Sequence, residues 1–186
     1  MGFDANRADL CIGVIGTGAM GRGIVQVAAA GGMHVLMMDT RAGAADEARD
    51  FVAKMLSRAA EKGSMTPADA DAATARIKVA HSLAEFKACH MVVEAIVENL
   101  DAKRALFGEL EDLVSADCIL ATNTSSMSVT TIAAKLKTPQ RFAGFHFFNP
   151  VPLMKLVEVI DGLQTENWVS EALMVIGKRM TREPVR

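Results

Sequence analysis

The sequence is poor in aromatic residues, has no tyrosine, and contains no long apolar run. Aromatic side chains make up 5% of the 186 residues, although 51% of the chain is hydrophobic. The apolar content therefore belongs to small, close-packed faces, which argues against the stacking platforms of a single-strand nucleic-acid binder. No apolar stretch reaches the roughly 20 residues that a membrane span needs, so we expect no membrane partner.

Neither sign of charge dominates. Lys and Arg number 20 against 22 Asp and Glu, which gives a formal net charge of -2. This balance provides no chain-wide attraction to nucleic acid or anionic lipid, so any anion site must be local. The start of the chain, MGFDANRADL, lacks the basic-then-apolar layout of a secretion signal, and we expect a cytoplasmic protein.

Cysteine is scarce and odd in number. Cys11, Cys89 and Cys118 are widely spaced, and each lies in or beside an apolar, strand-like run. This placement is typical of reduced core thiols in a reducing compartment. We therefore expect neither a disulfide nor a bound metal.

Short apolar runs alternate with segments of helical periodicity along the whole chain. The expected strands cover residues 11–15, 34–38, 77–80, 91–95, 118–122, 142–146 and 155–159, with a last one near the C-terminus. The expected helices cover residues 20–30, 44–62, 66–75, 99–114, 128–137 and 165–179. This alternation indicates an α/β fold of the Rossmann-like, doubly wound class, with a mostly parallel sheet covered by helices on both faces. We treat residues 1–186 as one domain.

A glycine-rich turn follows the first expected strand. Gly16, Gly18 and Gly21 form a GxGxxG pattern that includes Ala19 and Met20 and opens a helix. In that context the first glycine permits a tight turn, the second lets the backbone approach a pyrophosphate, and the third allows close helix packing. The N-terminus of the helix would stabilise the anion.

An acidic residue stands where a dinucleotide site needs one. Asp39 ends the second expected strand, 18 residues beyond Gly21, and its carboxylate would accept hydrogen bonds from the adenine ribose. A carboxylate there repels a 2'-phosphate, so we expect NAD rather than NADP as the cofactor. Arg41, two residues further on, is the one feature that favours NADP.

Several further motifs occur in a specific order: EAIVEN at 94–99, NTSS at 123–126, HFFNPVP at 146–152 and MKLVEV at 154–159. Together with GxGxMGxGI at 16–24, they resemble the N-terminal, NAD-binding domain of the (S)-3-hydroxyacyl-CoA and 3-hydroxybutyryl-CoA dehydrogenase family. The resemblance covers essentially the whole chain. It implies NAD-dependent oxidation of the 3-hydroxyl of an acyl-CoA substrate to a ketone, or the reverse reduction, within fatty acid β-oxidation.

The resemblance also assigns roles to individual residues. It implies that His146 is the catalytic base, that Glu158 orients and supports this histidine, and that Ser125 binds the reacting oxygen beside the nicotinamide. Further cofactor contacts implied by the resemblance are Glu98, Lys103 and Asn149.

The chemistry of these side chains agrees with the resemblance. An imidazole ionises near neutral pH and can both accept and return a proton. Twelve residues separate His146 from Glu158, enough for a loop between two neighbouring strands. Each feature also has a structural interpretation, because a histidine at a strand end is commonly a rim residue, Glu158 could face solvent, and the NTSS segment could be a turn.

A basic stripe lies on the second expected helix. Lys54, Arg58 and Lys62 recur at every fourth position and could meet the phosphates of CoA. In the family a lysine near the end of this helix contacts CoA, and Lys62 is the best match, with Lys54 a second candidate. The alternative is a solvated helix whose bases complement its macrodipole.

Members of the family continue into an all-helical domain that provides dimer contacts and part of the acyl-CoA pocket, and we expect that domain to be absent from this chain. Full-length members are expected to be homodimers. Two alternatives to an active enzyme therefore remain: an NAD-binding module without turnover of its own, and a related dehydrogenase of hydroxy acids that carry no CoA.

Overall fold

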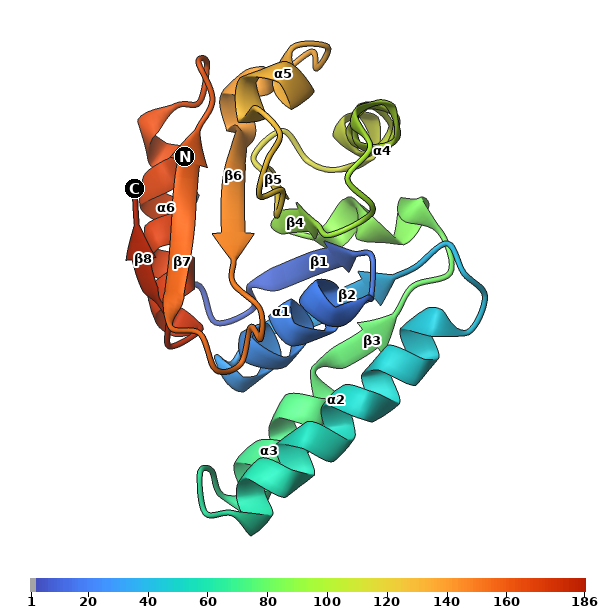
Figure 1. Ribbon diagram of the computed structural model, residues 1–186, viewed down its shortest axis with the longest axis vertical. Coiled ribbons are helices and arrows are strands. Elements are labelled where there is room, and N and C mark those ends of the chain that lie inside the picture. The colour runs from blue at the N-terminus through green and yellow to red at the C-terminus, as the bar shows by residue number, and fades with distance from the viewer. Residues whose placement is uncertain (1–2) are drawn as a thin grey trace.

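The computed structural model describes residues 3–186, which form one eight-stranded sheet with helices on both faces (Figure 1). Residues 1–2, where the expected domain begins, lie outside the described residues. The strands are β1 (Cys11–Ile15), β2 (His34–Met38), β3 (Ile77–Val79), β4 (Met91–Glu94), β5 (Ile119–Thr122), β6 (Phe142–Phe147), β7 (Leu156–Asp161) and β8 (Glu183–Val185). The helices are α1 (Ala19–Ala30), α2 (Ala44–Glu61), α3 (Pro67–Ala75), α4 (Leu100–Leu113), α5 (Val129–Ala133), α6 (Asn167–Arg179) and the short 3-10 helices η1 (Leu83–Ala88) and η2 (Pro139–Arg141).

The strand order is β3-β2-β1-β4-β5-β6-β7-β8. Every neighbouring pair is parallel except β6 and β7, which run antiparallel. The chain moves outward from β1 to β3 and then returns to the other side of β1 as β4. The carboxyl ends of β1 and β4 therefore form a topological switch point, where doubly wound sheets bind ligands. The predicted Rossmann-like class is confirmed.

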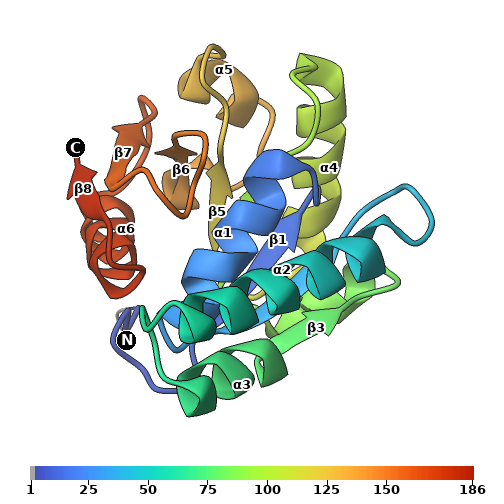
Figure 2. The same cartoon turned by 60° about the horizontal axis from the view of Figure 1, so that its bottom comes forward.

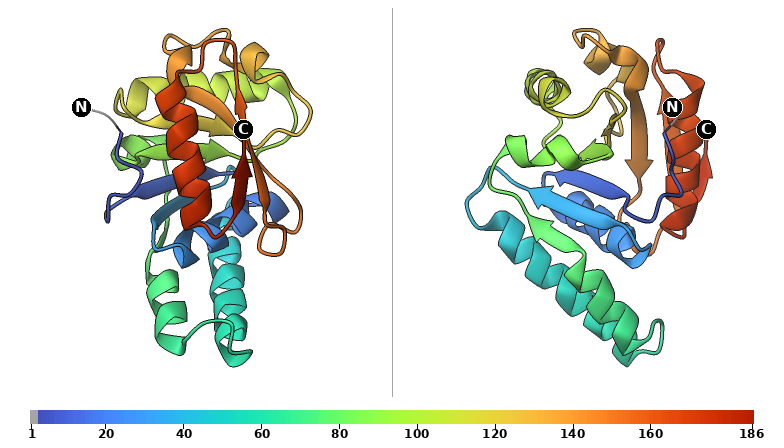
Figure 3. Two further views of the ribbon diagram at one scale, coloured as in Figure 1. Left: turned by 90° about the vertical axis from the view of Figure 1, so that its left-hand side faces the viewer. Right: turned by 180° about the vertical axis from the view of Figure 1, so that it is seen from behind.

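Alternate strand residues point into two apolar cores, one on each face of the sheet. Ile12 and Val14 of β1 belong to the core that α1, α2, α3 and α6 cover, whereas Ile15 belongs to the core beneath η1, α4 and α5. Figure 2 and Figure 3 show α2 and α3 side by side, extending past the end of the sheet. Within residues 3–186, no helix is both long and apolar enough to cross a membrane.

Capping side chains start three helices at positions that the sequence indicates. The Thr66 hydroxyl accepts a hydrogen bond from the N–H of Asp69 at 3.1 Å, and Pro67 occupies the first position of α3. Asn99 caps α4 and Ser128 caps α5 in the same manner. These caps fix where the segments before α4 and α5 leave the sheet, and both segments contribute residues to a cavity at the carboxyl ends of the strands.

The fifth helix is shorter than expected, because α5 ends at Ala133 rather than near residue 137. The backbone N–H groups of Lys137 and Thr138 donate to the carboxylate of Glu111 on α4. Those tertiary bonds replace the continuation of the helix. The two 3-10 helices were not expected either; at the start of η1, the Glu85 carboxylate accepts hydrogen bonds from the N–H groups of His81 and Ser82.

Candidate active site

The glycine turn lies between β1 and α1 and depends on two of its three glycines for its shape. Gly16 has a φ of +90°, and a Cβ there would lie 2.5 Å from the carbonyl oxygen of Ala95. A Cβ on Gly21 would lie 1.8 Å from the carbonyl oxygen of Gly16. A Cβ on Gly18 would meet nothing within 4 Å. Gly16 and Gly21 therefore serve the fold, whereas Gly18 faces open space.

That open space adjoins the N-terminus of α1, which begins at Ala19. Gly18 is the N-cap and has no side chain to bond the first N–H groups, and no acidic residue lies in the first turn. These donors, Ala19 and Met20 among them, are available to an anion, as the phosphate-binding turns of dinucleotide sites require. The Cβ-free position beside them leaves room for a pyrophosphate, so the turn fits the expected cofactor.

Asp39 follows β2 and is tied to the same turn. Its Oδ2 accepts hydrogen bonds from the N–H of Thr17 at 2.7 Å and from the Thr17 hydroxyl at 2.9 Å, and its Oδ1 accepts one from the N–H of Arg41 at 3.0 Å. Partial burial alone would raise the pKa of Asp39, but these hydrogen bonds outweigh it and hold the pKa below its ordinary value. The carboxylate is ionised and lines a cavity of about 180 Å³.

The Arg41 side chain turns toward α2 and pairs with Glu47. The shortest distance between the guanidinium and the Glu47 carboxylate is 2.7 Å, and both side chains are largely exposed. The cation that could neutralise a 2'-phosphate therefore already has an acidic partner. This pairing and the ionised Asp39 both favour a free ribose hydroxyl over a phosphate at this position.

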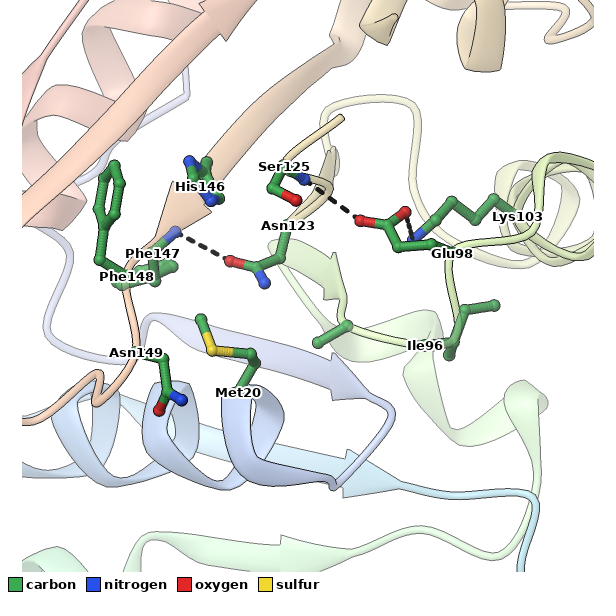
Figure 4. Close-up of a pocket in the computed structure, with 11 residues that line it drawn as sticks. Met20, Ile96, Glu98, Lys103, Asn123, Ser125, His146, Phe147, Phe148 and Asn149 are labelled. Carbon is green, nitrogen blue, oxygen red and sulfur yellow. Dashed lines mark hydrogen bonds and ion pairs between the residues drawn. The ribbon is translucent and has the colours of Figure 1, made fainter. Parts of the chain in front are cut away.

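A second cavity, of about 300 Å³, opens on the other side of the glycine turn at the carboxyl ends of β4, β5 and β6 (Figure 4). It brings together most of the residues that the sequence singles out. Its lining includes Met20, Ile96, Glu98, Lys103, Asn123, Ser125, His146, Phe148 and Asn149.

His146 and Glu158 lie directly opposite each other on the antiparallel strands β6 and β7. The distance from His146 Nδ1 to Glu158 Oε2 is 2.8 Å. A carboxylate can only accept, so Nδ1 is the donor, and in the tautomer that this bond selects the lone pair is on Nε2. No other hydrogen bond of this ring occurs within residues 3–186. The imidazole is therefore oriented as a proton acceptor at the cavity.

Ser125 lies in the loop after β5 and is held there by Glu98. The Glu98 carboxylate accepts hydrogen bonds from the Ser125 N–H at 3.2 Å and from the Thr124 hydroxyl at 2.9 Å. Partial burial raises the pKa of Glu98, but the Thr124 hydrogen bond and the charge of Lys103 outweigh it and lower the pKa below its usual value. Figure 4 shows the Ser125 and His146 side chains on neighbouring strand ends, with Glu98 and Lys103 beyond the serine.

Lys103 is almost fully buried at the start of α4, with 1% of its side chain exposed. Its ammonium lies 2.5 Å from Glu94 Oε1 and 3.4 Å from Glu98 Oε2. Glu94 is itself 0% exposed and accepts further hydrogen bonds from the Thr122 hydroxyl and the Ile96 N–H, each at 2.7 Å. This network connects the carboxyl end of β4 to the loop that contains Ser125.

The loop after β6 completes the cavity with Asn149, which lines it beside Met20 in Figure 4. Asn123, after β5, accepts a hydrogen bond from the Phe147 N–H at 2.9 Å and so joins the two strand ends. The Phe148 ring lies against His146, with ring centroids 4.6 Å apart. These contacts fix the position of the histidine relative to the serine loop.

The basic stripe on α2 divides between a cavity and solvent. Arg58 and Lys62 line a third cavity of about 430 Å³, between α1, α2 and the loop at 149–153. Lys54 is exposed and does not line it. Arg22 of α1 does, and its guanidinium stacks 4.0 Å from the centroid of the Phe51 ring. The cavity thus has three cations, of which two belong to the predicted stripe.

Sequence reasoning missed Glu94, Asn123 and Arg22 as site residues. Glu94 had a signal, since it is the single charged residue within the apolar run at 91–95. Asn123 stands in the recognised NTSS segment, but its role depends on the neighbouring strand. Arg22 had no signal of its own, because only the packing of α1 against α2 brings it to the third cavity.

Comparison with known proteins agrees with this geometry. The family model described as "3-hydroxyacyl-CoA dehydrogenase, NAD binding domain" matches residues 11–186. The chain belongs to this family. The predicted resemblance is thereby confirmed, and with it the expectation that the cofactor is NAD.

Individual relatives of this family are similar over most of the chain. A probable 3-hydroxybutyryl-CoA dehydrogenase of Bacillus subtilis is 42% identical over 172 residues, which cover 92% of this chain and 60% of that protein. The fatty acid oxidation complex subunit alpha of Psychrobacter arcticus is 39% identical over 92% of this chain and 24% of that subunit. The crystal structure of 3-hydroxybutyryl-CoA dehydrogenase from Escherichia coli matches with a TM-score of 0.93 and 40% identity, over 96% of this chain and 38% of that one. The chain thus spans less than two thirds of each relative.

Proposed function

We propose that this chain provides the NAD-binding and proton-transfer part of an NAD-dependent (S)-3-hydroxyacyl-CoA dehydrogenase, which oxidises the 3-hydroxyl to a ketone. The observation that supports this most directly is the His146–Glu158 pair at 2.8 Å, at a cavity adjoining a glycine turn suited to a dinucleotide. The reaction removes a hydride from C3 and a proton from the hydroxyl. It therefore needs a hydride acceptor and a base side by side.

The cofactor would extend along the carboxyl edge of the sheet. Asp39 would bond the adenine ribose, and the turn formed by Gly16, Gly18, Ala19, Met20 and Gly21 would hold the pyrophosphate. Further contacts would come from three residues of the second cavity, Glu98, Lys103 and Asn149. When bound there, NAD supplies the hydride acceptor of the reaction.

Within the second cavity, each side chain has a distinct task. His146 would take the hydroxyl proton on Nε2, and Glu158 would stabilise the resulting imidazolium through Nδ1 while it keeps the ring in one tautomer. Ser125 would donate a hydrogen bond to the oxygen as its proton leaves, and so position the substrate. In the reverse direction the imidazolium returns the same proton.

The CoA portion of the substrate would lie in the third cavity. Lys62, supported by Arg58 and Arg22, presents cations that suit phosphate groups. Lys54 would contribute only long-range attraction, because it does not line the cavity. The names of the relatives differ in the acyl group that they specify. One relative is a subunit of a fatty acid oxidation complex, and its name supports a β-oxidation substrate for this chain. A homodimeric complete enzyme and a cytoplasmic location remain our expectations.

The test is acetoacetyl-CoA-dependent oxidation of NADH by this chain, measured beside NADH affinity. We expect turnover that falls about 100-fold or more in His146→Ala while NADH affinity is unchanged. His34→Ala is the matched control, since His34 is exposed at the opposite edge of the sheet. NADH binding without turnover would indicate a module that requires further sequence, and faster reduction of free acetoacetate would indicate a hydroxy-acid dehydrogenase. Turnover unchanged in His146→Ala would refute the role of the base.

A further inference from the structure

A cavity of about 520 Å³ lies at the amino ends of β1 to β4, at the opposite edge of the sheet from the candidate active site. Two thiols, Cys11 and Cys89, take part in its lining. Both were expected to be reduced core thiols without a disulfide, and 78 positions separate them in the chain. The fold instead brings them together.

The two sulfur atoms are 3.9 Å apart and share a hydrogen bond. The neighbouring backbone holds them in place: the Cys11 N–H donates to His90 Nδ1 at 2.9 Å, and the His90 N–H donates to the Cys11 carbonyl at 2.9 Å. Cys11 is half-buried, whereas Cys89 is 1% exposed. Cys11 is thus the more accessible thiol, and Cys89 lies buried beside it.

The cavity around the thiols is cationic. Lys78, Lys87 and Arg76 line it, and neither lysine has an acidic partner within residues 3–186. Of its two carboxylates, Asp9 pairs with Arg7 at 2.7 Å, and Glu85 accepts backbone hydrogen bonds at the start of η1 but keeps its charge, so the three cations still outnumber it. An anion entering the cavity therefore meets unpaired positive charge.

The same surroundings make the two thiols chemically unequal. The hydrogen bond with Cys89 and the charge of Lys78 outweigh the effect of burial and lower the pKa of the Cys11 thiol below its usual value. That hydrogen bond and burial raise the pKa of the Cys89 thiol. Cys118 does not line the cavity, and burial raises its pKa to about 12. Because the thiolate is the nucleophile, Cys11 is the thiol that reacts first.

We propose that Cys11 and Cys89 form a dithiol site that reduces anionic low-molecular-weight disulfides and is itself oxidised to an intramolecular disulfide. The Cys11 thiolate attacks one sulfur of the disulfide RSSR, forms a mixed disulfide and releases RS⁻. Cys89 then attacks the Cys11 sulfur, releases the second RS⁻ and loses its proton. In sum, two protein thiols lose two electrons and two protons, and RSSR becomes two RSH.

Glutathione disulfide is a suitable probe, since its carboxylates match the cationic lining. The chain is equilibrated in glutathione buffers of increasing oxidised fraction, free thiols are alkylated, and peptides are analysed by mass spectrometry. We expect a Cys11–Cys89 cross-link, with Cys118 alkylated after unfolding, and an unchanged far-UV circular dichroism spectrum. Three results would each overturn the proposal: alkylation of both Cys11 and Cys89 at every ratio of oxidised to reduced glutathione, a disulfide that includes Cys118, or a mixed disulfide that persists in the wild-type chain.

Three variants test the order of events and the role of charge. Cys89→Ala should accumulate the glutathione adduct at Cys11, and the matched control Cys118→Ala should form the same cross-link as wild type. Lys87→Gln should slow the reaction with glutathione disulfide several-fold at low ionic strength, but not the reaction with uncharged hydroxyethyl disulfide. Equal rates of wild type and Lys87→Gln with glutathione disulfide would refute the preference for anions.

Discussion

Replacement of Lys103 by methionine tests the buried charge network most directly. Lys103 and Glu94 are 1% and 0% exposed, and their charged atoms lie 2.5 Å apart. Methionine fills a similar volume but removes the cation. Lys103→Met therefore leaves the buried Glu94 carboxyl group without its counter-charge, and only the Thr122 hydroxyl and the Ile96 N–H still bond its oxygens.

The cost of this change follows from the burial of the pair. Removal of one partner of a buried ion pair typically destabilises a protein by about 3–5 kcal/mol, because the remaining charge is uncompensated. Glu98 offers no replacement for the lost cation, since it has the same sign as Glu94. With a urea m-value of about 2 kcal/mol/M, a loss of about 4 kcal/mol lowers the unfolding midpoint by about 2 M.

Urea unfolding followed by circular dichroism measures this loss, and a double variant isolates its cause. Glu94→Gln/Lys103→Met removes both charges and keeps an amide that can bond Thr122 and Ile96. We expect it to recover about 2–3 kcal/mol of the loss caused by Lys103→Met alone. A single variant that loses less than about 1 kcal/mol, or a double variant no more stable than the single one, would refute the reasoning.

Three further outcomes are expected. Gly21→Ala should lower the urea midpoint, because its Cβ would meet the Gly16 carbonyl. Gly18→Ala should leave the urea midpoint unchanged and weaken NADH binding, which calorimetry measures. Equal urea midpoints of the two variants would contradict this. Asp39→Asn should lower the stability of the chain by a constant amount above pH 3.8, the ordinary carboxyl pKa. This difference should vanish as the pH falls through the lower pKa of Asp39 in the folded chain, because only the ionised carboxylate is stabilised. A pH-independent difference in urea titrations would contradict this. Glu158→Gln should reduce NADH oxidation about 100-fold at unchanged NADH affinity, and full activity would exclude the proposed role.

Much of the fold follows from patterns local to the sequence. The expected strand at 11–15 and the start of α3 after Thr66 agree with the structure because apolar runs, caps and glycines act over a few residues. The length of α5 was wrong, since Glu111 on α4 competes for the N–H groups that would have continued the helix. Competition from a segment more than 20 residues away leaves no local pattern to read.

The candidate site divides in the same way. Motifs identified Ser125 and His146, and the cavity contains both. The Glu94–Lys103 pair was found only in part, because the sequence marks each charge but not that both are buried against each other. The contact between Cys11 and Cys89 was missed for a related reason: strand order, and not sequence separation, decides which residues are neighbours.

The antiparallel pairing of β6 with β7 explains how a mostly parallel sheet brings His146 and Glu158 into contact. Two parallel neighbouring strands begin at the same end of the sheet, so a long crossover must join them. Residues that face each other across such a pair are therefore many positions apart in the chain. The loop at residues 148–155 between β6 and β7 instead reverses the chain, so that His146 stands opposite Glu158 and Phe147 opposite Val157. Side chains alternate faces along a strand, so a shift of one residue would turn Glu158 to the other face. The burial of Val157 and Val159 in the core on one face therefore fixes the register that keeps Glu158 at the histidine.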